Sequence, residues 1–112
     1  MKIAIASDLH LEFFDPNNDR INWPEADVLV LAGDICTFTK PFVLRIFMQR
    51  MSDRYPTVVY VPGNHEYYGS GIDRTRTGLK SLLDDLNNVY VLDDNFVDLN
   101  GIRFVGTTLW TS

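Results

Sequence analysis

The segment VLVLAGD, residues 28–34, carries the clearest structural signal in this 112-residue chain. Five apolar residues follow one another without a break, and a glycine and an aspartate then end the run. Two similar apolar runs are Ile3–Ala6, followed by SDLH, and Thr57–Val61, followed by PGNHE. Short, nearly continuous runs rich in β-branched residues are typical of strands that are covered on both faces of a sheet. The sequence therefore predicts three buried strands.

Two other segments have helical periodicity. The segment from Pro41 to Arg54 carries a broad apolar stripe, which predicts a buried helix beginning near Pro41. The segment from Ile72 to Asn88 has leucines at positions 79, 82, 83 and 86, which is the spacing of one helix face. The connections between the three strands are about a dozen residues or longer, which permits parallel crossovers and excludes tight hairpins. We therefore expect an α/β fold with a mostly parallel sheet.

The last quarter of the chain has the pattern of a β-hairpin. A fourth strand is predicted at Val89–Leu92, and a turn at residues 93–95 follows it. The apolar runs Phe96–Leu99 and Ile102–Leu109 flank Asn100-Gly101. Asn-Gly between two apolar runs is a strong indication of a two-residue hairpin turn.

Composition excludes some classes of function. Ten basic against fifteen acidic residues give a formal charge of -5, so non-specific binding to nucleic acid through charge is not expected. The single cysteine, Cys36, suits a reducing compartment. The sequence has no signal-peptide pattern and no apolar stretch of spanning length. We therefore expect a soluble cytoplasmic protein without membrane contact.

Polar clusters follow each of the first three strands directly. The clusters are residues 7–10, 33–34 and 63–66. Parallel strands place their carboxyl ends at one edge of a sheet, where open α/β folds bind ligands. Residues far apart in sequence would therefore meet there, and Gly33 would let the backbone come close to a bound ion.

The residue types in these clusters suit a divalent metal. Asp8 and His10 are two residues apart, so on an extended segment they project to the same side. The two carboxylate oxygens of Asp34 could each bind one ion, and Asn64 offers an amide oxygen. These donors favour manganese, iron, zinc or magnesium. His65 would stand beside the ions, able to donate a hydrogen bond to a phosphoryl oxygen or to protonate a leaving group.

Taken singly, each of these residues has an ordinary structural explanation. Aspartate is common in turns and caps, and a lone histidine is more often structural than catalytic. However, both histidines of the chain lie at predicted strand ends beside carboxylates or amides. This combination favours a metal site over the structural explanations.

The clusters resemble the signature blocks of the calcineurin-like metallophosphoesterase family. The matching blocks are SDLHLE at 7–12, LAGDI at 31–35 and VPGNHEYY at 61–68, in the same order and with plausible spacing. The resemblance spans nearly the whole chain. It implies a four-layer α/β/β/α sandwich, of which this chain would form the N-terminal half, with a binuclear metal centre between the strand ends.

The resemblance also implies a role for each residue. Asp8 and His10 would bind the first metal, Asp34 would bridge both, and Asn64 would bind the second. His65, with Asn64 beside it, would act in catalysis. The implied cofactors are two divalent ions, with manganese favoured, and the implied substrates are phosphomonoesters, phosphodiesters or nucleotides.

The sequence departs from the family pattern in its histidines. The family's later blocks supply further histidines, whereas this chain has two in total. One ion would have three protein donors, from Asp8, His10 and Asp34, and the other would have two, from Asp34 and Asn64. Because each ion needs roughly four to six donors, the second ion should bind weakly. Residues 1–112 are therefore interpreted as a single, apparently truncated metallophosphoesterase domain. A fragment, a truncated gene product and a half-domain that assembles all remain open.

The leading functional hypothesis is a hydrolase that cleaves phosphate esters with a metal-activated water. The alternative is a non-catalytic metal-binding or oligomerising half-domain. Most of the second sheet is missing, and the strand that follows Asn100-Gly101 has no charged residue after Arg103. An open apolar edge of this kind favours association, so we expect a two-fold dimer.

Overall fold

The computed structural model describes residues 1–7, 9, 23–33, 35, 41–63, 66 and 72–106, without the side chains of residues 72–74 and 76. In chain order, the elements are β1 (Ile3–Ala6), β2 (Val28–Ala32), α1 (Pro41–Arg54), β3 (Thr57–Val61), α2 (Ile72–Leu83), β4 (Val89–Val91), β5 (Asn95–Leu99) and β6 (Ile102–Gly106).

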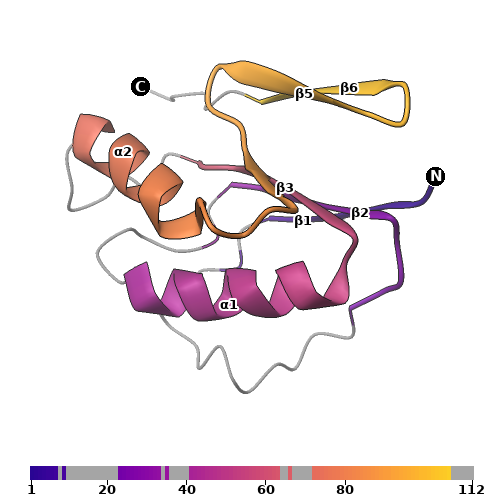
Figure 1. Cartoon of the computed structure of the whole chain (residues 1–112), viewed down its shortest axis with the longest axis horizontal. Coiled ribbons are helices and arrows are strands. Elements are labelled where there is room, and N and C mark those ends of the chain that lie inside the picture. The colour runs from indigo at the N-terminus through magenta and orange to yellow at the C-terminus, as the bar shows by residue number, and fades with distance from the viewer. Residues whose placement is uncertain are drawn as a thin grey trace.

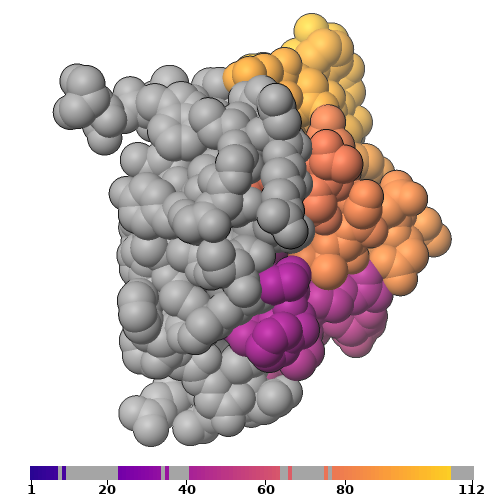
Figure 2. Space-filling model, turned by 90° about the vertical axis from the view of Figure 1, so that its left-hand side faces the viewer, coloured from indigo at the N-terminus to yellow at the C-terminus, as the bar shows by residue number. Residues whose placement is uncertain are grey.

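The elements form three layers, with helices α1 and α2 on one face of a parallel sheet and a β-hairpin on the other (Figure 1). The sheet has the strand order β1-β2-β3-β4, and all of its pairs are parallel. Strands β5 and β6 pair antiparallel. In a view from the side, Figure 2 shows the hairpin in yellow, α2 in orange and α1 in magenta, stacked in that order. These layers confirm the predicted fold class.

Alternation along β2 and β3 divides the core into two parts. Leu29, Leu31, Val58 and Tyr60 pack toward the helices, in what we call the helix-side core. Val28 and Val59 pack with Leu92, which directly follows β4, and with hairpin residues such as Val97 and Phe104. We call this second part the hairpin-side core. Because neighbouring residues of a strand point to opposite faces, both faces of β2 and β3 are covered.

Strand β1 corrects one expectation, because only one of its faces is covered. Ala4 and Ala6 pack against the helix-side core. Ile3 is exposed and Ile5 is 72% exposed on the other face. The strand lies at the edge of the sheet, and the hairpin-side core contains, among the described residues, side chains of β2 and β3 but none of β1.

Helix α1 has the predicted bounds but is not buried on all sides. Leu44, Phe47, Met48 and Met51 face the core, whereas Phe42 is 67% exposed. The broad apolar stripe is thus wider than the face that packs on the sheet. Figure 1 shows why, since α1 lies below the sheet with its far side turned away from every other labelled element.

Helix α2 ends at Leu83, five residues before the predicted end at Asn88. Two aspartates, Asp84 and Asp85, follow at once, and negative charge at a helix C-terminus is unfavourable. The Leu86 amide donates to the Leu83 carbonyl at 3.1 Å in a tighter turn. Leu86 stays buried although it is no longer helical, which explains why the leucine spacing continued past the helix.

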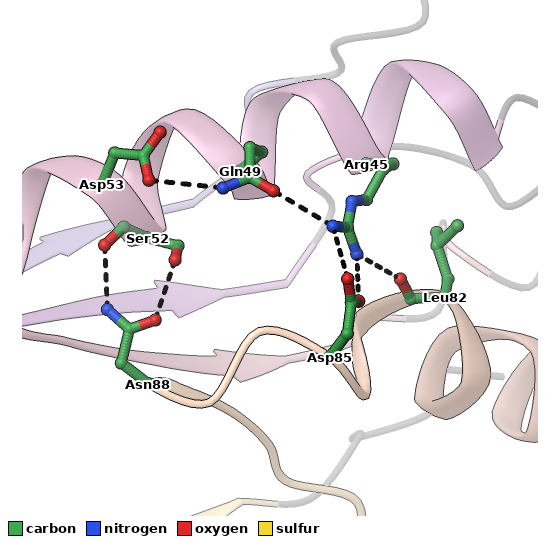
Figure 3. A network of polar contacts seen from close by, with 7 residues as sticks. All are labelled: Arg45, Gln49, Ser52, Asp53, Leu82, Asp85 and Asn88. Atoms are coloured by element: carbon green, nitrogen blue, oxygen red, sulfur yellow. Dashed lines mark hydrogen bonds and ion pairs between the residues drawn. The ribbon is translucent and has the colours of Figure 1, made fainter.

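Arg45 of α1 joins the two helices. Its guanidinium donates to both carboxylate oxygens of Asp85 and to the Leu82 carbonyl at 2.9 Å, as Figure 3 shows. The hydrogen bond from Arg45 holds the pKa of Asp85 below its usual range. Because the folded-state pKa is lowered, the pair adds stability at neutral pH and loses it as the pH falls through the carboxyl range. Exposed ion pairs of this kind contribute little to the free energy of unfolding.

Asn88 caps the C-terminus of α1 and fixes the start of β4. Its side-chain amide donates to the Ser52 carbonyl at 2.9 Å, and the Ser52 hydroxyl donates back to the side-chain oxygen of Asn88 at 2.8 Å (Figure 3). The same amide also donates to the Tyr55 carbonyl at 2.9 Å. The backbone carbonyl of Asn88 accepts from the Val58 amide at 2.9 Å. One side chain thus satisfies carbonyls that a helix end leaves without intrahelical partners, and it ties α1 to the chain that enters β4.

The hairpin turn confirms the Asn-Gly prediction. Asn100 and Gly101 have φ values of 50° and 80°, and Leu99 pairs with Ile102 across the two-residue turn. Positive φ at both positions is the type I′ geometry, which matches the twist of the flanking strands. On the outer face of the hairpin, the Arg103 guanidinium lies 4.1 Å from the ring centroid of Phe96.

In the part of the chain that the structure describes, no helix is both long enough and apolar enough to cross a membrane.

Candidate metal centre

The first three strands end together at one edge of the sheet. Ala6 of β1 is level with Leu31 of β2, and Ala32 of β2 is level with Val61 of β3. All three strands run in parallel, so their carboxyl ends lie along the same edge. This arrangement is the one in which open α/β sheets bind ligands.

The backbones that follow β2 and β3 touch at Gly33 and Gly63. A Cβ atom placed on Gly33 would lie 3.0 Å from the Cα of Gly63 and 3.2 Å from its nitrogen. Gly33 also has a φ of +84°, in the left-handed region that favours glycine. We expected Gly33 to let the backbone approach an ion, and the structure shows that it lets the two strand-end segments approach each other.

The residues predicted to bind metal or to act in catalysis lie outside the described residues. They are Asp8, His10, Asp34, Asn64 and His65. Their roles therefore stay predictions.

The described neighbours of these residues are held firmly. Gly33 and Ile35, on either side of position 34, are both buried, and Ile35 has no exposed surface. Leu9, which lies between positions 8 and 10, packs against the helix-side core. Gly63 precedes position 64 and contacts Gly33. The described residues beside the predicted donors are thus packed into the fold, and Gly33 and Gly63 are in contact.

The donor set fits a divalent metal on two counts. Its carboxylate, imidazole and amide groups are those that manganese, zinc, iron and magnesium accept. The contact of Gly33 with Gly63 brings together the two segments that carry the proposed bridging carboxylate and the proposed amide donor. Within the described ranges, no group of three or more histidine, cysteine, aspartate or glutamate side chains forms a rival site.

Tyr60 is a residue of this region that the sequence did not single out. Its hydroxyl donates to Oε2 of Glu66 at 2.5 Å, and both side chains are fully buried. In the sequence, Tyr60 is simply part of an apolar strand run. The usable signal was the residue type, because a buried tyrosine hydroxyl generally finds a hydrogen-bond partner.

A groove of about 330 Å³ lies between the end of α2 and strands β4 and β5. Lys80, Asp84, Tyr90 and Phe96 are among its lining residues. Among the described residues of the polar clusters that follow β1, β2 and β3, none lines this groove.

The level strand ends and the contact of Gly33 with Gly63 define an α/β protein whose parallel strands end at one edge, the edge at which open α/β sheets bind ligands. The chain belongs to the calcineurin-like phosphoesterase family, whose model matches residues 1–111. The recognition made from the three sequence blocks is confirmed.

Curated relatives from a virus and a bacterium are similar over nearly the whole chain. An uncharacterized protein of Acanthamoeba polyphaga mimivirus is 33% identical over 127 residues, which cover 98% of this chain and 44% of that protein. An uncharacterized metallophosphoesterase of Helicobacter pylori is 32% identical, covering 95% of this chain and 29% of that protein. The chain thus spans less than half the length of these relatives.

A solved structure shows the same fold. The phosphopantetheinyl hydrolase of Mycobacterium tuberculosis superposes with a TM-score of 0.66 at 22% sequence identity, covering 88% of this chain and 38% of that chain. At this identity the likeness concerns the arrangement of helices and strands.

Proposed function

We propose that this chain contributes the metal centre of a hydrolase that acts on phosphate esters. The observation that carries the proposal is the contact of Gly33 with Gly63, which joins two of the three predicted donor segments at the carboxyl edge of the sheet. Membership of the calcineurin-like phosphoesterase family supports the same chemistry.

The proposed ligands are Asp8, His10 and Asp34 for one ion, and Asp34 and Asn64 for a second, weaker one. Manganese is the favoured metal. Two such ions would polarise a phosphoryl group and supply an activated water. His65 would hold a proton for a phosphoryl oxygen or for the leaving oxygen.

Titration of manganese into the metal-free protein tests the centre. We expect binding heat from the wild type and a loss of affinity of at least about 100-fold in Asp34→Ala. Replacing residues that only orient metal ligands already costs up to about 100-fold, and loss of a ligand itself should cost no less. Asp84→Ala is the matched control, because it removes an exposed carboxylate beyond the end of α2. Equal uptake by the wild type and Asp34→Ala would contradict the proposed centre.

The second candidate function is a non-catalytic metal-binding or oligomerising module. It is favoured by the small number of donors, two histidines in the whole sequence. Hydrolysis of a chromogenic phosphodiester separates the two candidates. We expect slow turnover that requires manganese, stops in chelator and falls about 100-fold in His65→Ala. Manganese binding with no turnover at all would favour the module.

The proposed location is the cytoplasm. One cysteine cannot form a disulfide within the chain, which suits a reducing compartment.

We also propose that two copies associate through the uncovered face of β1. Ile3 and Ile5 are both exposed there, on the same face of the strand. Neighbouring exposed apolar side chains of this kind commonly mark an interface, and a two-fold dimer is the commonest closed assembly.

Light scattering after size exclusion tests this assembly. The wild type is expected to be a dimer at micromolar concentration, and Ile5→Lys a monomer, because a charge would be buried at the interface. Phe42→Lys is the control, since Phe42 is similarly exposed, 67% against 72% for Ile5, but lies on α1 on the opposite face of the sheet. A monodisperse wild-type monomer that binds no apolar dye would refute the proposal.

A further inference from the structure

A buried hydrogen bond links strand β3 to the turn that follows it. The Tyr60 hydroxyl donates to Oε2 of Glu66 at 2.5 Å, and both residues have 0% exposure. The Tyr60 side chain lies in the helix-side core, under the sheet. The Glu66 carboxyl group therefore reaches back from beyond the end of β3 into the layer between the sheet and the helices.

The turn that Glu66 ends is closed by the backbone as well. The Glu66 amide donates to the Gly63 carbonyl at 3.2 Å, and Gly63 lies against Gly33. Positions 64 and 65 are the two residues between Gly63 and Glu66. The segment predicted to supply one metal ligand and the catalytic histidine is thus held at both ends.

A glutamate is a costly residue for this position. Burial of a carboxyl group is unfavourable unless hydrogen bonds compensate for the lost contacts with water. An apolar side chain of similar size would destabilise the core less. Directional bonds, however, fix one orientation, which a leucine packed in the same space would not. The chemistry of the pair is therefore suited to positioning rather than to stability alone.

We infer that Tyr60 is a positioning residue that acts through Glu66. Its hydroxyl holds Glu66, which is bonded back to Gly63 and directly follows Asn64 and His65 in the chain, and it thereby supports the role proposed for these two residues at the metal centre. The link to metal rests on the proposed function, whereas the restraint on the turn rests on the described contacts alone.

Two tyrosine variants isolate this role. Tyr60→Phe removes the hydroxyl that holds the turn. Tyr55→Phe is the matched control, because the Tyr55 hydroxyl is also part of a buried side chain and donates to the Pro24 carbonyl, away from the turn. Both variants keep the aromatic ring and lose one hydrogen bond, but the Tyr60–Glu66 bond is fully buried and the Tyr55–Pro24 bond only partly, so Tyr60→Phe should lose more global stability. Urea denaturation measures this difference, and the exchange rates below are compared after correction for it.

Amide hydrogen exchange measures the restraint directly. The Glu66 amide is expected to exchange about tenfold faster in Tyr60→Phe than in Tyr55→Phe. Glu66→Gln keeps a side-chain oxygen that can accept from Tyr60 and should exchange more slowly than Glu66→Leu, which fills the space without an acceptor. This second pair tests the inference through a different side chain.

Manganese titration measures the consequence for the site. We expect affinity to fall about 10-fold or more in Tyr60→Phe, as for other residues that orient metal ligands, and to stay near the wild-type value in Tyr55→Phe. Equal exchange at Glu66 in the two tyrosine variants overturns the inference. Equal manganese affinity in the two variants overturns the positioning role alone, while a wild type that takes up no manganese overturns the proposed centre and this role together.

Discussion

Gly33→Ala is expected to lower the free energy of unfolding by about 2–5 kcal/mol and to weaken manganese binding strongly. An alanine at a φ of +84° is strained, by about 1–2 kcal/mol. Its Cβ would also lie 3.0 Å from the Cα of Gly63, a backbone atom that cannot turn aside. Forcing the two backbones apart adds about 1–3 kcal/mol. Urea denaturation and calorimetric titration measure the two effects.

Gly101→Ala separates backbone strain from the close contact. Gly101 has a similar φ, +80°, but a Cβ there would meet nothing within 4 Å. Its replacement should cost about 1–2 kcal/mol through strain alone and leave manganese binding unchanged. If both variants lost the same stability, the contact of Gly33 with Gly63 would contribute nothing. If Gly33→Ala kept wild-type affinity, the two segments would not need to touch for metal to bind.

Local sequence patterns predicted most elements because their causes are local. The runs at Ile3–Ala6, Val28–Ala32 and Thr57–Val61 became strands with the predicted bounds, since β-branched residues pack well on a pleated surface. The turn at Asn100 and Gly101 was predictable for a similar reason, because the two residues tolerate positive φ.

Tertiary contacts explain what the sequence left undecided. Nothing in the run at Ile3–Ala6 shows that one face of the strand lies at a sheet edge beyond the reach of the hairpin. The carbonyl of Leu82 in the last turn of α2 accepts from Arg45, a residue 37 positions away. The cap that Asn88 makes on α1 spans 36 positions. The apolar repeat of a helix, 3.6 residues, or of a strand, 2 residues, does not indicate which residues meet over such distances in the chain.

The metal site was predicted from residue types and from the rule that parallel strand ends converge. The described backbone supports the convergence, since Ala32 and Val61 are level and Gly33 touches Gly63. The hydrogen bond between Tyr60 and Glu66 was missed, because the order of residues does not show which polar side chain turns into the core. Its burial, which the sequence does not show, identifies Glu66 as a residue of the core.

Gly106 provides the second large expected effect, and here the cause is steric. A Cβ on this buried residue would lie 2.4 Å from Cβ of Leu92 and 3.0 Å from Cγ2 of Val61. Leu92 cannot move away easily, because its amide donates to the Tyr60 carbonyl at 2.8 Å. Gly106→Ala should therefore push the hairpin off the sheet and cost about 3 kcal/mol.

Displacement of the hairpin has a second consequence, which distinguishes it from simple strain. Val28 and Val59 belong to the hairpin-side core and are covered by the hairpin, so they should become accessible when β6 shifts. We expect Gly106→Ala to bind an apolar dye more strongly than the wild type, whereas Gly101→Ala at the exposed turn should not. A loss of stability in Gly106→Ala no greater than in Gly101→Ala, with no added dye binding, would mean that the hairpin can slide over the sheet without cost. The contact of β6 with Leu92 would then not hold the two sheets together.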